Sequence, residues 1–107
     1  MNKYRNIKTN GFDSKKEQSR YGELLLMQRA GLISDLRRQV PIELIPSQYV
    51  DGKCVERAVK YVADFVYKER GEIVVEDVKS VITRKNKDYI IKRKLLLFIH
   101  HIRLKET

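Results

Sequence analysis

Apolar residues recur at helical spacing in the first patterned stretch of the chain. The stripe consists of Tyr21, Leu24, Leu25, Met27 and Leu32. Asp13 or Ser14 can cap the first turn, and Glu17 stands three residues after Ser14, which is the spacing of a capping box. Gly31 is a typical residue just beyond a helix C-terminus. The pattern predicts a helix over Lys15–Ala30.

The pattern then changes to alternation of apolar and polar positions from Ile33 to Ile45, which is typical of a strand. Pro41 and Pro46 each lack a main-chain donor, so we expect this strand to be bent or to lie at a sheet edge. The segment Ser47–Lys53 contains Asp51-Gly52 and predicts a turn.

The strongest strand signal follows. Residues Val55–Tyr67 are largely β-branched or aromatic, Lys68–Gly71 predicts a short turn, and Glu72–Val78 predicts the returning strand of a hairpin. Helical spacing returns over Lys85–Phe98, and alternation returns over His101–Glu106. The order helix, strand, strand, strand, helix, strand predicts an αβββαβ domain of the α/β (α+β) class.

The length of 107 residues allows one domain. We expect a flexible N-terminal arm over residues 1–10 and a single domain over residues 11–107. Cys54 is the only cysteine, which excludes an internal disulfide and favours a reducing compartment. The longest apolar run, Leu95–Ile99, is far shorter than the ~20 residues of a membrane span. With no apolar N-terminal stretch, the expected location is the cytoplasm.

The formal charge of +9 is unevenly distributed. Between Lys79 and Lys105 the only acid is Asp88. Such an excess attracts polyanions, and nucleic acid is the partner that we expect. The expected phosphate contacts from this region are Arg84, Lys85, Lys87, Tyr89, Lys92, Arg93 and Lys94. Ordinary solvation of a helix face is the alternative interpretation.

Acidic side chains mark a candidate site on the predicted hairpin. Asp64 interrupts an apolar strand, where a carboxylate must be paired, exposed or bound to a metal. Asp77 and Lys79 are two residues apart and therefore share a face of a strand. If Tyr67 pairs with Glu72, Asp64 lies opposite Val75 with Asp77 as its diagonal neighbour. A register slipped by one residue would bring Glu76 to that side instead.

Two carboxylates beside a lysine suit Mg²⁺, which prefers oxygen ligands and keeps several waters. Asp64, Asp77 and the main-chain carbonyl of Val78 are the candidate ligands. A metal there would activate water and stabilise charge on a phosphodiester, and Lys79 would position the water or neutralise the transition state. Glu17 would complete the site from outside the sheet, or serve only in the capping box.

Three segments in this order resemble a known nuclease group. They are Phe12–Glu17, Tyr61–Tyr67 with Asp64, and Val74–Lys79 with Asp77-Val78-Lys79. Together they resemble the PD-(D/E)xK superfamily, which has the restriction-endonuclease-like fold. More closely, they are similar to a family of small phage proteins described as endonuclease-like or Holliday-junction-resolvase-like. The resemblance extends over about Gly11 to Lys105.

The resemblance implies a mixed central sheet flanked by two helices and Mg²⁺- or Mn²⁺-dependent cleavage of DNA. It makes Glu17, Asp64, Asp77 and Lys79 the catalytic residues, and it places Gln39 near the site as a nucleic-acid-binding residue. The proline that the superfamily carries before the first strand acid is Ala63 here. Relatives commonly act as dimers, so a homodimer is expected, in the host cytoplasm if the protein is phage-encoded. The alternatives are a non-catalytic module of the same fold that binds nucleic acid and, less favoured, an RNA-processing enzyme.

Overall fold

The computed structural model describes residues 11–12 and 14–107; the predicted arm over residues 1–10, and Asp13, lie outside the described residues. The elements are α1 (Lys15–Arg29), β1 (Ser34–Ile45), β2 (Gln48–Val50), β3 (Lys53–Glu56), β4 (Val59–Glu69), β5 (Glu72–Asp77), α2 (Val81–Arg84), α3 (Lys87–His100) and β6 (Lys105–Glu106). The protein is therefore a mixed α and β structure, as the pattern of periods predicts.

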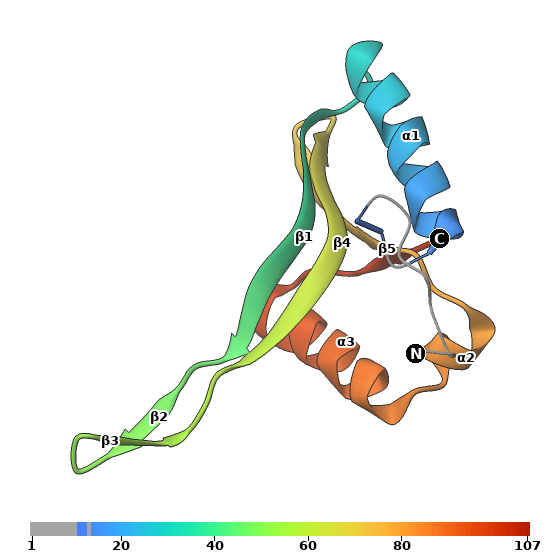
Figure 1. Cartoon of the computed structure of the whole chain (residues 1–107). Helices are drawn as coiled ribbons and strands as arrows, with labels where there is room; N and C mark the ends of the chain where they lie inside the picture. The colour runs from blue at the N-terminus through green and yellow to red at the C-terminus, as the bar shows by residue number, and fades with distance from the viewer. Residues whose placement is uncertain (1–10, 13) are drawn as a thin grey trace.

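The main sheet has the strand order β1-β4-β5-β6 (Figure 1). The pairs β1–β4 and β4–β5 are antiparallel, whereas β5 and β6 are parallel, so the sheet is mixed. The strand β1 lies at the edge, which confirms the expectation from Pro41, because a missing donor is tolerated where no second strand pairs.

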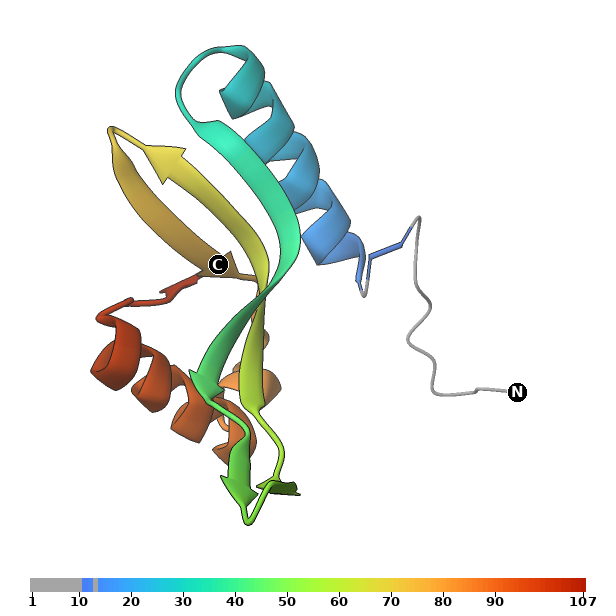
Figure 2. The same ribbon diagram turned by 90° about the vertical axis from the view of Figure 1, so that its left-hand side faces the viewer.

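The two long helices pack on separate apolar clusters of the twisted sheet (Figures 1 and 2). The cluster beside α1 contains the buried residues Leu24, Ile33, Phe65 and Tyr67. The cluster beside α3 contains Leu44, Tyr61, Ala63, Val66, Val75, Tyr89 and Leu96. The flanking helices of the sequence prediction are thus confirmed, and each one covers its own part of the sheet.

The regular alternation of side chains between the two faces of the sheet is interrupted in the middle of β4 and β1. In β4, Ala63 and Val66 are three residues apart yet share the cluster beside α3, while the intervening Phe65 joins the cluster beside α1. Across from this point, Gln39 in β1 has a φ of 51°, in the left-handed region. This irregularity lies between the paired residues Arg38–Phe65 and Val40–Ala63, and Asp64 stands opposite Gln39.

The segment before β4 differs from the prediction. Residues 47–53 were expected to form only a turn, but β2 and β3 pair as a separate two-stranded hairpin that projects from the body (Figure 1). The turn shrinks to Asp51-Gly52, because both residues have positive φ and close the hairpin tightly. The expected continuous strand over Val55–Tyr67 is accordingly divided between β3 and β4.

The register of the β4–β5 hairpin is also different. Glu69 pairs with Glu72, so the expected pairing of Tyr67 with Glu72 is wrong by two residues. Arg70 and Gly71, with φ of 55° and 81°, form a two-residue turn in place of the expected four-residue one. A shift of two preserves the faces of the strand, so Asp77 stays on its expected side.

The C-terminal elements are shorter or shifted. Asn86 caps α3 through a hydrogen bond from the N–H of Tyr89, so the helix begins two residues later than predicted and the short α2 precedes it. The expected strand over His101–Glu106 reduces to Lys105–Glu106, because His101 ends α3 in a left-handed conformation and a connecting segment follows. Among the described residues, none of the helices combines the length and apolarity needed to span a membrane.

Candidate active site

The centre of the candidate site is a pair of hydrogen bonds that join Asp64 to Asp77 and to the next residue, Val78. The main-chain N–H of Asp64 donates to Oδ1 of Asp77 at 2.6 Å. The Asp64 carboxylate in turn accepts from the N–H of Val78 through Oδ2 at 2.9 Å. The sequence-predicted carboxylate pair is therefore brought together, across the end of the β4–β5 hairpin.

Asp77 is almost fully buried, with 1% of its surface exposed. Its Oδ2 accepts a hydrogen bond from the hydroxyl of Tyr61 and lies 2.8 Å from Nζ of Lys79. Burial raises the pKa of the Asp77 carboxyl above its ordinary value, although Lys79 and the N–H of Asp64 act in the opposite direction. Asp77 and Lys79 thus form a close ion pair that is largely shielded from solvent.

Two aromatic rings lie close to the ammonium group of Lys79. Its Nζ lies 4.5 Å from the ring centroid of Tyr89 and 5.8 Å from that of Tyr61. The Tyr89 hydroxyl donates to Oε2 of Glu106, which pairs with Asp77 in the parallel β5–β6 ladder. Burial and this bond raise the pKa of Tyr89, so its hydroxyl stays protonated. The two rings hold the Lys79 head beside Asp77 through cation–π attraction.

Glu17 reaches the site from α1. Ser14 caps this helix by accepting from the N–H of Glu17, and the Glu17 side chain is 3% exposed. The Gln39 amide Nε2 donates to Oε2 of Glu17 at 2.9 Å and contacts Oδ1 of Asp64 at 3.3 Å. Gln39, whose backbone is left-handed, therefore joins the helix-borne acid to the strand acid.

Asp77 faces the site, whereas Glu76 belongs to a different network on the opposite face of β5. The Glu76 carboxylate is fully buried and accepts hydrogen bonds from Arg20 Nε at 2.5 Å and from the Tyr67 hydroxyl at 2.6 Å. Thr107 adds a third donor at 3.2 Å. Burial alone would raise the pKa of Glu76, but the hydrogen bonds from Arg20 and Tyr67 outweigh it, and the pKa lies below its ordinary value.

The expected phosphate-binding residues divide into two groups. The exposed side chains are Arg84, Lys85, Lys87 and Lys94, while Lys92 and Arg93 are half-buried. Arg84 lies 3.6 Å from Glu106 and Lys92 lies 3.4 Å from Asp88. Tyr89 does not fit the expectation that it faces phosphates, because it is 6% exposed and its hydroxyl is bonded inside the protein.

Sequence reasoning missed Tyr61, Glu106 and Lys16. Lys16 Nζ donates to the main-chain oxygen of Lys79 at 3.2 Å, which ties α1 to the end of β5. Glu106 is placed by the parallel pairing of β6 with β5, and no spacing in the sequence signals that pairing. Tyr61 lies three residues before Asp64 in an apolar run, and this pattern predicts an ordinary core residue.

Comparison with protein families identifies one match. Residues 1–107 match a family described as a protein of unknown function, DUF1064. The chain belongs to the DUF1064 family. Comparison with curated proteins and with solved structures gives no significant match. For this DUF1064 protein, function must therefore be argued from the site itself.

The DUF1064 site offers carboxylate oxygens as donors for a divalent cation. In residues 11–12 and 14–107, no three Asp, Glu, His or Cys side chains form a metal-binding group. Asp64 and Asp77 do lie at the same end of the β4–β5 hairpin, where each carboxylate accepts one main-chain hydrogen bond. Because Mg²⁺ is commonly held by one or two carboxylates and several waters, the oxygen donors of these two side chains are of the kind that such an ion prefers.

Proposed function

We propose that this protein is a metal-dependent endonuclease that hydrolyses DNA phosphodiester bonds, with a restriction-endonuclease-like core. The observation that carries the proposal is the convergence of acids from α1, β4 and β5 with Gln39 and Lys79. Glu17 and Asp64 contact the same amide nitrogen of Gln39, and Asp64 exchanges main-chain hydrogen bonds with the Asp77 strand. Branched recombination intermediates are the proposed substrates, by resemblance to resolvase-like proteins.

The proposed metal ligands are Asp64, Asp77 and the Val78 carbonyl, holding Mg²⁺ or Mn²⁺. When bound, such an ion supplies Lewis-acid stabilisation of negative charge and lowers the pKa of water. The remaining chemistry falls to side chains of the protein. Lys79, fixed between Asp77 and two aromatic rings, neutralises charge that develops on the scissile phosphate.

Glu17 acts at the margin of this site. Its carboxylate is buried and is held by the Gln39 amide, so its orientation is fixed before substrate arrives. In that position it orients the attacking water or takes its proton. Gln39 is a positioning residue, since its amide holds Glu17 and Asp64 at a constant separation.

DNA is the proposed partner because exposed basic side chains follow the acid-x-Lys segment along the chain. Lys85, at the C-terminal end of α2, and Lys87, the first residue of α3, are both exposed. Clustered acids oppose phosphate binding unless a cation intervenes, so these lysines and the metal would act together. Phosphate contacts of this kind predict affinity that falls steeply with salt.

The proposal is tested by incubating the protein with linear duplex, single-stranded and four-way-junction DNA in Mg²⁺, Mn²⁺ or EDTA. Cleavage is expected with either metal and none in EDTA. Asp77→Asn should abolish it, whereas Asp51→Asn, the same change in the exposed β2–β3 turn, should leave it intact. Equal cleavage by wild-type protein and Asp77→Asn would overturn the mechanism.

A non-catalytic module that binds nucleic acid is the second candidate. One observation favours it: Asp77 already receives hydrogen bonds from Tyr61 and Asp64 and an ion pair from Lys79. Those contacts would suffice to hold a purely structural aspartate. Salt-dependent binding of all three DNAs, with cleavage of none, would establish this second function.

We further infer that the active form is a homodimer. A dimer of such a small domain would contact a longer stretch of DNA and would bury more surface than the monomer. Several apolar side chains are also exposed. On α3 and on the projecting hairpin these are Ile91, Leu97, Phe98, Ile99, Tyr49, Val50 and Val55. Light scattering at assay concentration should give twice the chain mass of 12.7 kDa, and a monomer would refute the inference.

A further inference from the structure

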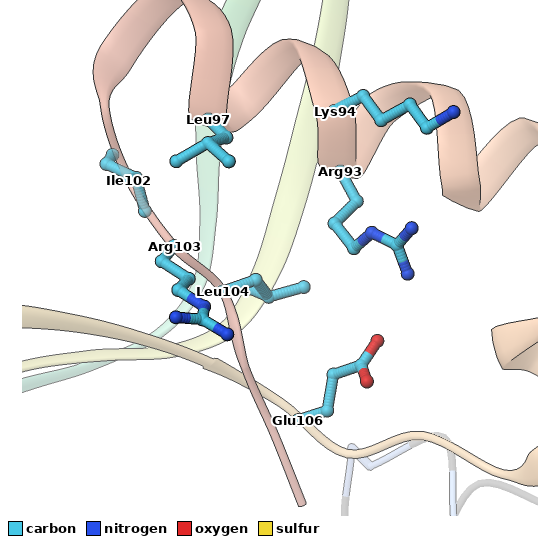
Figure 3. Close-up of a pocket in the computed structure, with 7 residues that line it drawn as sticks. All are labelled: Arg93, Lys94, Leu97, Ile102, Arg103, Leu104 and Glu106. Carbon is cyan, nitrogen blue, oxygen red and sulfur yellow. The ribbon is translucent and has the colours of Figure 1, made fainter.

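A cavity of about 340 Å³ lies between the last turns of α3 and the segment that leads into β6 (Figure 3). Its apolar wall is formed by Leu97, Ile102 and Leu104. Ile102 and Leu104 also pack against the core cluster beside α3, so this wall is anchored in the body of the protein. A cavity of this size is at the lower end of the range for small-molecule sites.

The rest of the cavity lining is charged, with three cations against one carboxylate. The cations are Arg93, Lys94 and Arg103, and the carboxylate is Glu106. Figure 3 shows the guanidinium of Arg93 and the carboxylate of Glu106 pointing toward each other, while Lys94 points away along the helix. Among the described residues, no carboxylate forms an ion pair with any of the three cations. The pocket therefore has an excess of positive charge beside an apolar wall.

The cavity adjoins the candidate active site through Tyr89. Arg93, which lines the cavity, lies 5.8 Å from the Tyr89 ring centroid, and Lys79 lies 4.5 Å from the same centroid. Glu106 belongs to both places, because it lines the cavity and accepts the hydrogen bond from the Tyr89 hydroxyl. A group bound in the cavity would thus lie next to the residues proposed to act on the scissile phosphate.

These features favour a ligand with an anionic group, a flat apolar body and hydrogen-bond donors on its edge. A single nucleotide has all three, and the volume admits one nucleotide but no base pair. Guanidinium planes such as that of Arg103 stack on bases and bind phosphate, and a carboxylate such as Glu106 accepts from exocyclic amino groups. We propose that the cavity binds one unpaired nucleotide of the DNA strand beside the cleavage site. This rests on the proposed function and narrows its substrate to DNA with an unpaired nucleotide.

The first test measures binding without metal. Chemical-shift titrations of the full chain in EDTA compare 2′-deoxyadenosine 5′-monophosphate, deoxyribose 5-phosphate and inorganic phosphate. The nucleotide is expected to bind about tenfold more tightly than the other two, because base stacking adds to phosphate contacts. The largest shifts are expected at Leu97, Arg103 and Leu104. Equal affinities, or shifts centred elsewhere, would overturn the proposal.

The second test separates DNA from free nucleotide as the source of the ligand. Fluorescence anisotropy in EDTA compares a duplex carrying one extrahelical adenosine with the same duplex fully paired. The extrahelical duplex should bind about tenfold more tightly. Nucleotide binding without this preference would show that the cavity takes free nucleotides, and would refute the DNA proposal.

Matched variants connect the preference to the cavity. Arg103→Ala and Leu97→Gln should abolish it, since both side chains line the cavity and are exposed enough to be replaced without disturbing the core. Arg29→Ala and Leu26→Gln make the same changes on exposed positions of α1 and should preserve it. An equal effect of both pairs would contradict the assignment. Because no metal is present, failure of cleavage leaves this outcome intact, and the two proposals fail separately.

Discussion

The main-chain N–H of Asp64 donates to the Asp77 carboxylate at 2.6 Å, and the Asp64 carboxylate accepts from the N–H of Val78 at 2.9 Å. Asp77 thus satisfies the main-chain donor of Asp64, and Asp64 satisfies that of the residue that follows Asp77. The same side chains that are proposed to hold a metal therefore also hold the end of the β4–β5 hairpin. This double role predicts that substitutions at Asp64 affect both stability and activity, in separable ways.

Asp64→Ala should lower the free energy of unfolding by about 1–3 kcal/mol, because it leaves the Val78 N–H without its acceptor. Asp64→Asn keeps one acceptor oxygen, so its cost should stay under about 1 kcal/mol. Both variants should lose cleavage, since neither supplies the anionic ligand. Urea unfolding and a cleavage assay on the same preparations check this. If Asp64→Asn retained full cleavage, Asp64 would have no role in the chemistry.

Gln39 is expected to tolerate glycine better than valine. Its φ of 51° strains a β-branched residue but not glycine, and both substitutions remove the same amide. The Val variant should therefore be less stable than the Gly variant by about 1–3 kcal/mol in urea unfolding. At Lys60, an exposed position of β4, the order should be reversed because an ordinary strand favours valine. If the Val variant were the more stable one at both positions, the left-handed backbone at Gln39 would carry no strain.

Tyr89 should act through its ring more than through its hydroxyl. Tyr89→Phe keeps the ring 4.5 Å from Lys79 and should retain cleavage within about threefold, whereas Tyr89→Leu should lose about tenfold with the cation–π contact. Single-turnover cleavage rates check this, and Tyr49→Leu on the exposed β2–β3 hairpin should have no effect. Equal losses in both Tyr89 variants would make the hydroxyl bond to Glu106 the important contact.

Long periodic stretches and the acids within them could be predicted from the sequence, since α1, β1, β4, β5 and α3 each lie close to their expected ranges. Asp77 also stayed on its expected face despite a register error of two residues, because the side-chain period of a strand is two. The interruption of the strand alternation at Gln39 and Asp64 could not be predicted. Glutamine carries no local signal for a left-handed backbone, and only the surrounding contacts impose it.

The surroundings of the site were the least predictable part. Tyr61 occurs in an apolar run that predicts a core strand, whereas Tyr89 was expected to face phosphate; both pack in the core. Their hydroxyl groups nevertheless bond to Asp77 and Glu106. Such contacts depend on long-range pairing, above all on the parallel addition of β6 to β5, for which a two-residue strand offers almost no pattern.

Glu76 should stabilise the protein at neutral pH and lose that contribution in acid. Its pKa in the folded state lies below the ordinary value of 4.5, because hydrogen bonds from Arg20 and Tyr67 outweigh the cost of burial. A lowered pKa means that the stabilisation is fully present above pH 4.5 and disappears as the pH falls through the folded-state value. Glu76→Gln keeps the shape but removes the charge that faces Arg20, and should cost about 2–4 kcal/mol at pH 7.

Urea unfolding of both proteins from pH 7 down to the acid transition measures this difference, which should shrink steadily below pH 4.5. Glu72→Gln, the same change at an exposed position of β5, should alter stability by less than about 0.5 kcal/mol at any pH. A constant difference between wild-type protein and Glu76→Gln across the titration would mean that Glu76 contributes by packing alone. In that case the Arg20–Glu76 pair would bind α1 to β5 by shape and not by charge.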